Sequence, residues 1–343
     1  MAYSGILDDI RRCAGLGVPS RVPVFAISQE CDLRLSGHTH EEYGRDPGVM
    51  ARVHIEGIER FDYDWAFLIP DDYMEIEPLG VKTRSLPGAP RAAVEYPVFD
   101  DATVGNLQTP DYHATGRMPA QLEALGRIKA QFGDTVCVTG NVAGPFSSVA
   151  LTFEIGPMLT VLIDDPDLVR RALSFFVDLQ IEWGRAQAAA GADAIWLGDC
   201  VATSAFISAP HYAEFALEGA QRVCAALQQT GTLVFYHGGE TNSSHLELMT
   251  RVGADMLSIG ERTDIAPIKN AIGTDVGLMG NLDGIHVLRD QSPDEVAAET
   301  NRIIQACKPG GAYIFNTGEA VAYDTPEKNI HAMMQAARAS GGY

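Results

Sequence analysis

The sequence predicts a (β/α)₈ barrel, in which eight parallel strands alternate with helices and close into a ring. Eight short apolar runs rich in β-branched residues alternate with longer runs of helical period along the chain. The length of 343 residues suits such a barrel with insertions. An open doubly wound sheet is the competing architecture, but the Gly-rich "GLGVP" near residue 16 precedes the first predicted strand instead of following one. We therefore expect a single TIM-barrel domain over residues 1–343.

Each predicted strand is a short apolar run bounded by turn residues, as expected for strands buried on both faces. The eight runs span residues 22–28, 65–70, 136–142, 194–199, 232–237, 256–260, 276–281 and 312–317.

Helical patterns fill the intervals between these strands, at residues 165–191, 209–231, 243–254 and 292–311. Ser208 and Ser292 stand where helix N-caps are expected, and Gly191, Gly231 and Gly310 stand where helices should end. Residues 1–17 have the pattern of a surface helix, which predicts an N-terminal helical extension ahead of the barrel.

The long interval 71–135 after the second predicted strand indicates an insertion. Its segment "IEPLGVKTRSLPGAPRAAVEYPVFDD" has the Pro, Gly and Val content of a β-hairpin. Because it follows a strand, it should extend over the upper face of the barrel. It could act there as a lid, or it could be a packed surface insertion without a role in chemistry.

Composition and charge narrow the class of protein. Hydrophobic residues make up 46% of the chain and charged residues 20%, which is typical of a soluble globular enzyme. The formal charge of −20 disfavours nucleic acid and anionic membranes as partners. The sequence has neither a long apolar span nor a signal-peptide core, so we expect a cytoplasmic protein. The six cysteines form no CxxC pair, which argues against a disulfide framework. The sequence is compatible with a homodimer without requiring one.

Polar residues gather at the ends of the predicted strands, where barrel enzymes place their active sites. A histidine, a cysteine and several carboxylates converge there with few Lys or Arg residues, which is the ligand set of a borderline-soft cation such as zinc. Each acid taken alone could instead cap a following helix. The strand-end residues are Gln29, Glu30, Cys31, Asp32, Asp71, Asp72, Asn141, Asp199, Cys200, His237, Glu240, Glu261, Asp264, Asn281, Asp283 and Glu319.

Several of these residues lie in segments that resemble the uroporphyrinogen decarboxylase superfamily, and specifically its corrinoid-linked methyltransferase branch. The resemblance covers nearly the whole chain, and its carriers include "GDCVATSAFISAPHYAEF" (198–215) and "VFYHGGETN" (234–242). It is most specific in "DTPEKN" (324–329), ahead of a terminal helix, which resembles the closing signature of that family. A decarboxylase is less expected, because that family places two arginines after the first strand to hold substrate carboxylates. Here "FAISQECDLRLSG" (25–37) brings Ser, Gln, Glu and Asp to the same place.

The resemblance implies a zinc site that departs from the pattern of the branch. Members of that branch bind zinc through a histidine, a cysteine two residues later, and a cysteine after the last strand. The matching residues here are His237, Gly239 and Glu319, so both thiolates are missing. We therefore expect His237, Glu319 and Cys200 as zinc ligands, with the fourth position left to water or a substrate oxygen. A zinc ion with fewer thiolates is harder and more Lewis acidic, and it suits an oxygen-containing substrate.

This chain is similar to the first methyltransferase of O-demethylase systems, which moves a methyl group from a phenyl methyl ether to the cob(I)amide of a separate corrinoid protein. No DxHxxG corrinoid-binding signature is present, so the cobamide should arrive on a partner protein. The expected catalytic residues are Asp199 and Glu240, which would orient the metal ligands, and Asn141, which would touch the substrate. The other expected substrate contacts are Gln29, Phe25, Trp196, Phe206 and Met279, although the aromatic residues and the methionine could equally belong to the core.

Three alternatives stay open. The protein could move a methyl group from a methyl-corrinoid protein to a thiol such as coenzyme M. It could be a non-catalytic protein that binds a corrinoid protein and whose own metal site has degraded through the loss of the two thiolates. A uroporphyrinogen decarboxylase-like lyase is the third.

Overall fold

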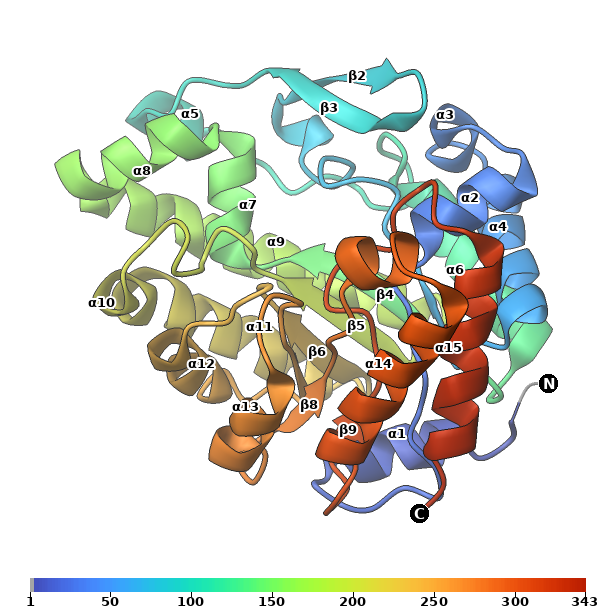
Figure 1. The fold of residues 1–343 in the computed structure, drawn as a ribbon. Helices are drawn as coiled ribbons and strands as arrows, with labels where there is room; N and C mark the ends of the chain where they lie inside the picture. The colour runs from blue at the N-terminus through green and yellow to red at the C-terminus, as the bar shows by residue number, and fades with distance from the viewer. Residues whose placement is uncertain (1–2) are drawn as a thin grey trace.

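A computed structural model describes residues 3–343 and shows an α/β fold built around a curled parallel sheet (Figure 1). The sheet contains seven strands in the order β1-β4-β5-β6-β7-β8-β9, and each neighbouring pair is parallel. Every one of these strands lies at a predicted apolar run. Their bounds are β1 Trp65–Phe67, β4 Cys137–Ala143, β5 Ala194–Gly198, β6 Leu233–His237, β7 Met256–Ser258, β8 Gly277–Met279 and β9 Tyr313–Ile314.

The predicted first strand, residues 22–28, is not a regular strand. Val24 forms an isolated parallel bridge with Phe315, beyond the end of β9. The Phe25 N–H donates to the Phe315 carbonyl at 2.8 Å, and the Asp64 N–H donates to the Val24 carbonyl at 3.0 Å. The segment therefore hydrogen-bonds on one side next to β9 and on the other next to β1. Pro23 has no N–H to give to a ladder, which explains why the pairing stays irregular.

Helices cover the outside of the sheet (Figure 1). The predicted helix 165–191 is α9, and the predicted helix 209–231 is divided into α10, the π-helix η2 and α11. The helices are α1 Ile6–Ala14, α2 Gln29–Ser36, α3 His40–Tyr43, α4 Pro47–Phe61, η1 Glu77–Leu79, α5 Asp101–Gly105, α6 Met118–Phe132, α7 Pro145–Thr152, α8 Ile155–Asp164, α9 Pro166–Ala189, α10 Ala209–His211, η2 Tyr212–Ala216, α11 Leu217–Gln228, α12 Ser243–Thr250, α13 Ile265–Ile272, η3 Gly284–Arg289, α14 Pro293–Cys307 and α15 Glu327–Ser340.

The predicted helix signals are confirmed. The Ser208 side chain accepts the His211 N–H, and Ser292 forms a reciprocal capping box with Glu295. Gly191 has a positive φ of 113°, a conformation that a side chain would strain. The N-terminal helix forms as α1, and residues 1 and 2 of its predicted range lie outside the described residues.

No single helix between residues 3 and 343 is long and apolar enough to cross a membrane. The bent pair α7 and α8, with 111° between the two helices, meets the same criteria of length and composition. All but one of the residues of α7 are buried.

The hairpin predicted in the insertion is present. Strands β2 (Lys82–Leu86) and β3 (Ala89–Glu95) pair antiparallel and lie at the top of the molecule as drawn in Figure 1. Arg91 of β3 forms an ion pair with Glu41 of α3 at 2.6 Å, which ties the hairpin to the N-terminal helices. Pro90 and Arg91 line a cavity that residues at the ends of the sheet strands also line, so the hairpin forms part of the wall of that cavity.

Aromatic side chains stack through the centre of the sheet. The ring of Phe25 stacks on Trp65 with centroids 4.3 Å apart, and Trp65 stacks on Phe67 at 5.1 Å. Phe67 in turn contacts Trp196 of β5 at 5.0 Å. This column of rings leads from the buried core to the carboxyl ends of the strands, where the polar residues lie.

A candidate active site at the carboxyl ends of the strands

A cavity of about 580 Å³ opens at the carboxyl ends of the strands. Its apolar wall includes Phe67, Ile69 and Trp196. Its polar lining comes from the ends of different strands and from the insertion, and comprises Gln29, Glu30, Asp71, Asp72, Glu75, Arg91, Asn141, Ser147, Cys200, His237 and Glu319. The cavity thus joins an aromatic surface to a group of ionisable side chains, as small-molecule sites do.

His237, the last residue of β6, is buried in this cavity with 4% of its surface exposed. Its Nδ1 lies 3.0 Å from the Ser258 hydroxyl, and its Nε2 lies 3.6 Å from Oε1 of Glu319. Burial lowers the pKa of His237, but Cys200 and Glu319 outweigh this effect and raise it to about 10. In the neutral ring with its proton on Nδ1, donated to Ser258, the Nε2 lone pair faces the cavity, where a metal-binding histidine presents it.

Glu319 occupies space that a side chain at position 239 would need. A Cβ placed on Gly239 would lie 2.4 Å from Oε1 of Glu319, far closer than two such atoms can approach. Gly239 also has a positive φ of 64°. Burial raises the pKa of Glu319, but His237 outweighs this effect and lowers it. Gly239 therefore leaves room for a carboxylate that comes from the loop after β9, whereas a side chain at Gly238 would meet Met249 and Thr203.

The third predicted ligand, Cys200, lies on the loop after β5 and lines the cavity with an exposed side chain. It lies near enough to His237 to raise the pKa of that ring. The part of the chain from residue 3 to 343 nevertheless contains no group of three or more His, Cys, Asp or Glu side chains arranged to hold a metal. His237 and Glu319 fit one imidazole and one carboxylate ligand of zinc, and Cys200 is close to His237 without completing a group of three donors in the described part of the chain.

Asp199 was expected to orient the metal ligands, and the structure corrects this expectation. The side chain is fully buried, and its Oδ1 accepts the Ser147 N–H at 3.0 Å and the Ser147 hydroxyl at 2.7 Å. Its Oδ2 accepts the Tyr236 hydroxyl at 3.0 Å. Burial raises the pKa of Asp199 to about 6, against the lowering effect of these bonds. The Asp199 side chain therefore connects the start of α7 to β6 and does not bond the His237 ring, although the Asp199 backbone N–H donates to the His237 carbonyl at 2.7 Å.

Glu240 also does not bond the His237 ring, but it holds the loop that carries Cys200. Its carboxylate accepts the Ser204 N–H at 2.7 Å and the Ser204 hydroxyl at 2.9 Å. It also accepts the N–H groups of Thr241 and Asn242. These bonds lower the pKa of Glu240 although burial opposes them. Glu240 joins the loop after β5 to the loop after β6.

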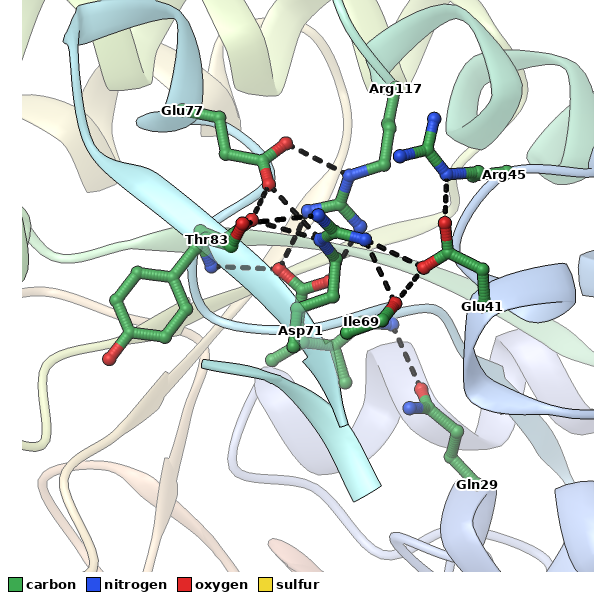
Figure 2. Close-up of polar contacts among 11 residues, drawn as sticks. Gln29, Glu41, Arg45, Ile69, Asp71, Glu77, Thr83 and Arg117 are labelled. Atoms are coloured by element: carbon green, nitrogen blue, oxygen red, sulfur yellow. Dashed lines mark hydrogen bonds and ion pairs between the residues drawn. The ribbon is translucent and has the colours of Figure 1, made fainter. Parts of the chain in front are cut away.

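Three of the expected substrate-contacting side chains line the cavity: Gln29, Asn141 and Trp196. The Gln29 Oε1 accepts the Ile69 N–H at 3.3 Å, as Figure 2 shows, and the Tyr43 hydroxyl at 3.0 Å. These two bonds fix the orientation of the Gln29 amide. The Asn141 backbone is held on both sides by the Gln187 side chain.

The other three expected contacts are corrected, because they do not line the cavity. Phe25 and Met279 are fully buried in the core, where Phe25 stacks on Trp65. Phe206 lies on the surface with 45% of its area exposed.

Sequence reasoning missed the ion-pair network that supports the insertion (Figure 2). The Arg117 guanidinium donates to both oxygens of Asp71, at 2.5 and 2.9 Å, and its Nε donates to Glu77 at 2.9 Å. Arg91 donates to Glu41 and to the Thr83 hydroxyl. The partners are 46 residues apart in the first pair and 50 in the second, so no local spacing could have indicated them.

Comparison with known proteins identifies the family. The family model "Uroporphyrinogen decarboxylase (URO-D)" matches residues 8–340. The chain belongs to the uroporphyrinogen decarboxylase family. The resemblance read from the sequence is thus confirmed, and relatives of this URO-D family member include methyltransferases as well as decarboxylases.

Two curated relatives illustrate this range. The uroporphyrinogen decarboxylase of Azoarcus sp. is 26% identical over 321 residues, which cover 90% of this chain and 87% of that protein. The methylcobamide:CoM methyltransferase MtbA of Methanosarcina mazei is 27% identical over 228 residues, which cover 65% of this chain and 64% of that protein.

Solved structures agree with the fold. A structure described as a methyltransferase from Methanosarcina mazei superposes with a TM-score of 0.89 at 21% identity, covering 97% of this chain and 98% of that one. A B12-independent methionine synthase from Shewanella gives a TM-score of 0.56 at 11% identity, covering 84% and 86%.

Proposed function

We propose that this URO-D family member is a methyltransferase that moves a methyl group from a methoxylated aromatic compound, a phenyl methyl ether, to the cob(I)amide of a separate corrinoid protein. The observation that carries the proposal is the cavity in which the Trp196 ring lies 4.7 Å from the His237 ring, and His237 faces Glu319. This arrangement supports the proposal, because an aryl ring bound against Trp196 would bring its ether oxygen close to His237 and Glu319. The methyltransferase names of two relatives support methyl transfer as the reaction class.

The chemistry needs positive charge at the ether oxygen. The methyl–oxygen bond breaks, the two electrons of cobalt(I) form the cobalt–carbon bond, and the aryl oxygen leaves as an alkoxide that takes up a proton. An aryloxide is a poor leaving group, so a positive group close to that oxygen lowers the barrier to breaking the methyl–oxygen bond. Zinc, when bound, would be held by His237 and Glu319, with Cys200 as a third ligand, and would supply that charge.

The residues of the chain itself have distinct tasks in this proposal. Ser258 holds the His237 ring through Nδ1, so that Nε2 faces the cavity. The Trp196 and Phe67 rings give the aryl group a flat apolar surface. Gln29 and Asn141 offer amide groups to ring substituents, and Glu240 holds the Cys200 loop in place. The hairpin reduces the access of water from above.

The same proposal completes the architecture. Segment 22–28 would take the place of the eighth strand, because it hydrogen-bonds next to both β9 and β1. The barrel would then be a single domain with a helical extension at its N-terminus and an insertion after β1, and the partner corrinoid protein would approach the open end of the cavity.

A thiol acceptor such as coenzyme M is the second candidate, because one relative carries that activity in its name. The residues disfavour it here. The resemblance places the two thiolates of the zinc site at positions that hold Gly239 and Glu319 in this chain. A thiolate-poor site is less suited to thiol activation than to an oxygen ligand.

Decarboxylation of a polycarboxylate is disfavoured by charge. Among the described residues that line the cavity, Arg91 is the one arginine or lysine, whereas five side chains are carboxylic acids. Arg91 is already paired with Glu41 and Glu77. Such a cavity would repel a substrate with many carboxylates.

The test uses the purified protein, a reduced corrinoid protein and a methoxyarene, and follows the absorbance of cob(I)amide. We expect the ether to methylate cobalt, and we expect His237→Ala and Glu319→Ala each to reduce the rate at least about a hundredfold, as loss of a transition-state contact would. His113→Ala and Glu218→Ala, at exposed positions, are matched controls that should retain the rate. Zinc content is measured for the same variants and for Cys200→Ser.

Three outcomes separate the candidates. Demethylation of methylcobalt that requires a thiol, with no reaction of the ether, would replace the proposal by the thiol methyltransferase. Zinc binding without either reaction would favour the non-catalytic corrinoid partner. Unchanged zinc content in all three ligand variants would refute the ligand assignment.

A further inference from the structure

Two carboxyl groups of the cavity differ from the other three in having no cationic partner. Asp71 is paired with Arg117, Glu30 with His40, and Glu319 with His237. Within residues 3–343, neither Asp72 nor Glu75 forms an ion pair with a lysine, arginine or histidine, and both line the cavity. Both follow β1, three residues apart. Their negative charge is therefore available to whatever occupies the cavity.

The surroundings of Glu75 leave one side of its carboxyl group for a ligand. Glu75 is 5% exposed, and its Oε1 accepts the Ala143 N–H at 3.0 Å and the Gln180 amide at 2.7 Å. The indole N–H of Trp183 lies close enough to lower the pKa of Glu75 as a donor, although its geometry is outside that of a regular hydrogen bond. No hydrogen bond within the described chain ends on Oε2.

Neighbouring acids add to the cost of ionising these two carboxyl groups. Burial raises the pKa of Glu75 to about 7, against the hydrogen bonds that lower it, and Asp72 contributes to the rise. Asp72 is exposed, and its pKa is raised by partial loss of solvent and by the charge of Asp71. The other ionisable groups that face the pair are Tyr73 and Tyr112. None of these groups supplies positive charge, so a bound cation would be stabilised here.

A separate observation shows that the cavity is prepared for a ligand. Gln29 is only 7% exposed, and its Oε1 is fixed by Tyr43 and Ile69. The amide nitrogen of Gln29, on the cavity wall, has no hydrogen-bond partner in the described part of the chain. This N–H₂ group is not fully enclosed, so a ligand oxygen in the cavity can reach it and accept its hydrogen bond. The neighbouring Trp196 and Phe67 rings suit an aromatic ligand and can also face a cation.

We propose that the cavity selects a methyl donor that carries a protonated amine, with the ammonium group between Asp72 and Glu75 and the aromatic ring against Trp196 and Phe67. This inference rests on the proposed function, which supplies the methoxy group as methyl donor, and it adds that the substrate carries a positive charge. Methoxylated aromatic amines are then the substrate class, and methoxybenzoates and other anionic ethers are excluded by repulsion.

Binding to the full-length protein, measured by calorimetry without any corrinoid protein, tests the charge. Three compounds share one ring and differ in side chain: para-methoxyphenethylamine, the neutral para-ethylanisole and the anionic para-methoxyphenylacetate. We expect the amine to bind at least about tenfold more tightly than the neutral ether, the effect of one well-placed charged hydrogen bond. The anion should bind most weakly.

Amide variants that keep shape test the two residues. Asp72→Asn and Glu75→Gln should each remove most of the preference for the amine and leave the affinity for para-ethylanisole within about twofold, because only the charge is lost. Glu218→Gln, at an exposed position, is the control and should retain the preference. Near pH 7, amine binding to the unaltered protein should release protons, seen as a heat that depends on the buffer, because a cation lowers the pKa of Glu75.

The outcomes separate this inference from the proposed function. Equal binding of amine and neutral ether, or an amine preference that survives both amide variants, would overturn the inference. Amine binding without transfer of the methyl group to cobalt would leave the inference standing and remove the proposed function. Methyl transfer from para-ethylanisole without any preference for the amine would do the reverse.

Discussion

Replacing Asp64 by alanine should destabilise the fold strongly, because this carboxylate binds two segments that are distant in sequence, residues 21–24 and α15. Asp64 is 3% exposed and directly precedes β1. Arg21 donates to its two oxygens at 2.7 and 3.1 Å, and Arg338 of α15 donates to both at 2.7 and 3.0 Å. The Val24 N–H adds a fifth bond at 2.7 Å. The alanine variant leaves two partly buried guanidinium groups without this partner, which costs about 3 to 5 kcal/mol for a broken buried ion pair.

Urea unfolding followed by tryptophan fluorescence measures this cost. A loss of that size should move the midpoint by on the order of 1 M. Asp167→Ala is the control, because Asp167 is 76% exposed in its pair with Arg170 and should contribute less than about 1 kcal/mol. Equal effects of the two substitutions would refute the reasoning, since the buried carboxylate would then contribute no more than a surface one.

Three further predictions concern single positions. Asp32 is buried with Oδ1 unpartnered among residues 3–343, and burial raises its pKa to about 7. The folded protein therefore binds more protons than the unfolded chain between about pH 4 and pH 7, and stability should fall as pH rises through that window. Asp32→Asn should reduce this slope by the share of Asp32, since Glu75 and Asp199 also have raised pKa values, as unfolding at pH 5 and pH 8 will check; an unchanged slope would contradict the assignment. Arg91→Lys should raise KM several-fold with little change in kcat, because lysine cannot reproduce the bonds to Glu41 and Thr83 that hold the hairpin over the cavity; steady-state kinetics separate the two constants. Glu240→Gln should lower the rate about tenfold by loosening the Ser204 contact, and a fall in the protease resistance of the loop after β5 should accompany it.

The strands were predictable because buried parallel strands are short apolar runs, and β4 through β8 begin within one residue of the expected positions. The prediction was wrong for residues 22–28, where Pro23 interrupts the ladder, and it was too long for β9, which regular pairing limits to Tyr313–Ile314. The pattern of apolar residues gives the existence of a strand, and backbone hydrogen bonds decide its length.

The candidate site was predictable to the level of strand ends and no further. His237 and Glu319 lie at the ends of their strands and face each other, as expected. Asp199 occupies an equivalent position, yet its carboxylate turns to Ser147, because a buried acid takes the nearest donors. The sequence also does not tell how far an inward-facing residue lies from the end of the sheet. Phe67 lines the cavity, whereas Phe25, stacked on Trp65, lies in the core below it.

The Glu319 carboxylate and the missing side chain of Gly239 share one volume, and this has a consequence for redesign. A cysteine introduced at 239 alone would collide with Glu319 and meet an unfavourable backbone angle, so its failure would say nothing about whether sulfur can serve in this cavity. Shortening residue 319 in the same variant removes the collision. Residues 239 and 319 therefore have to be substituted together in any attempt to convert this site into the thiolate site of other family members.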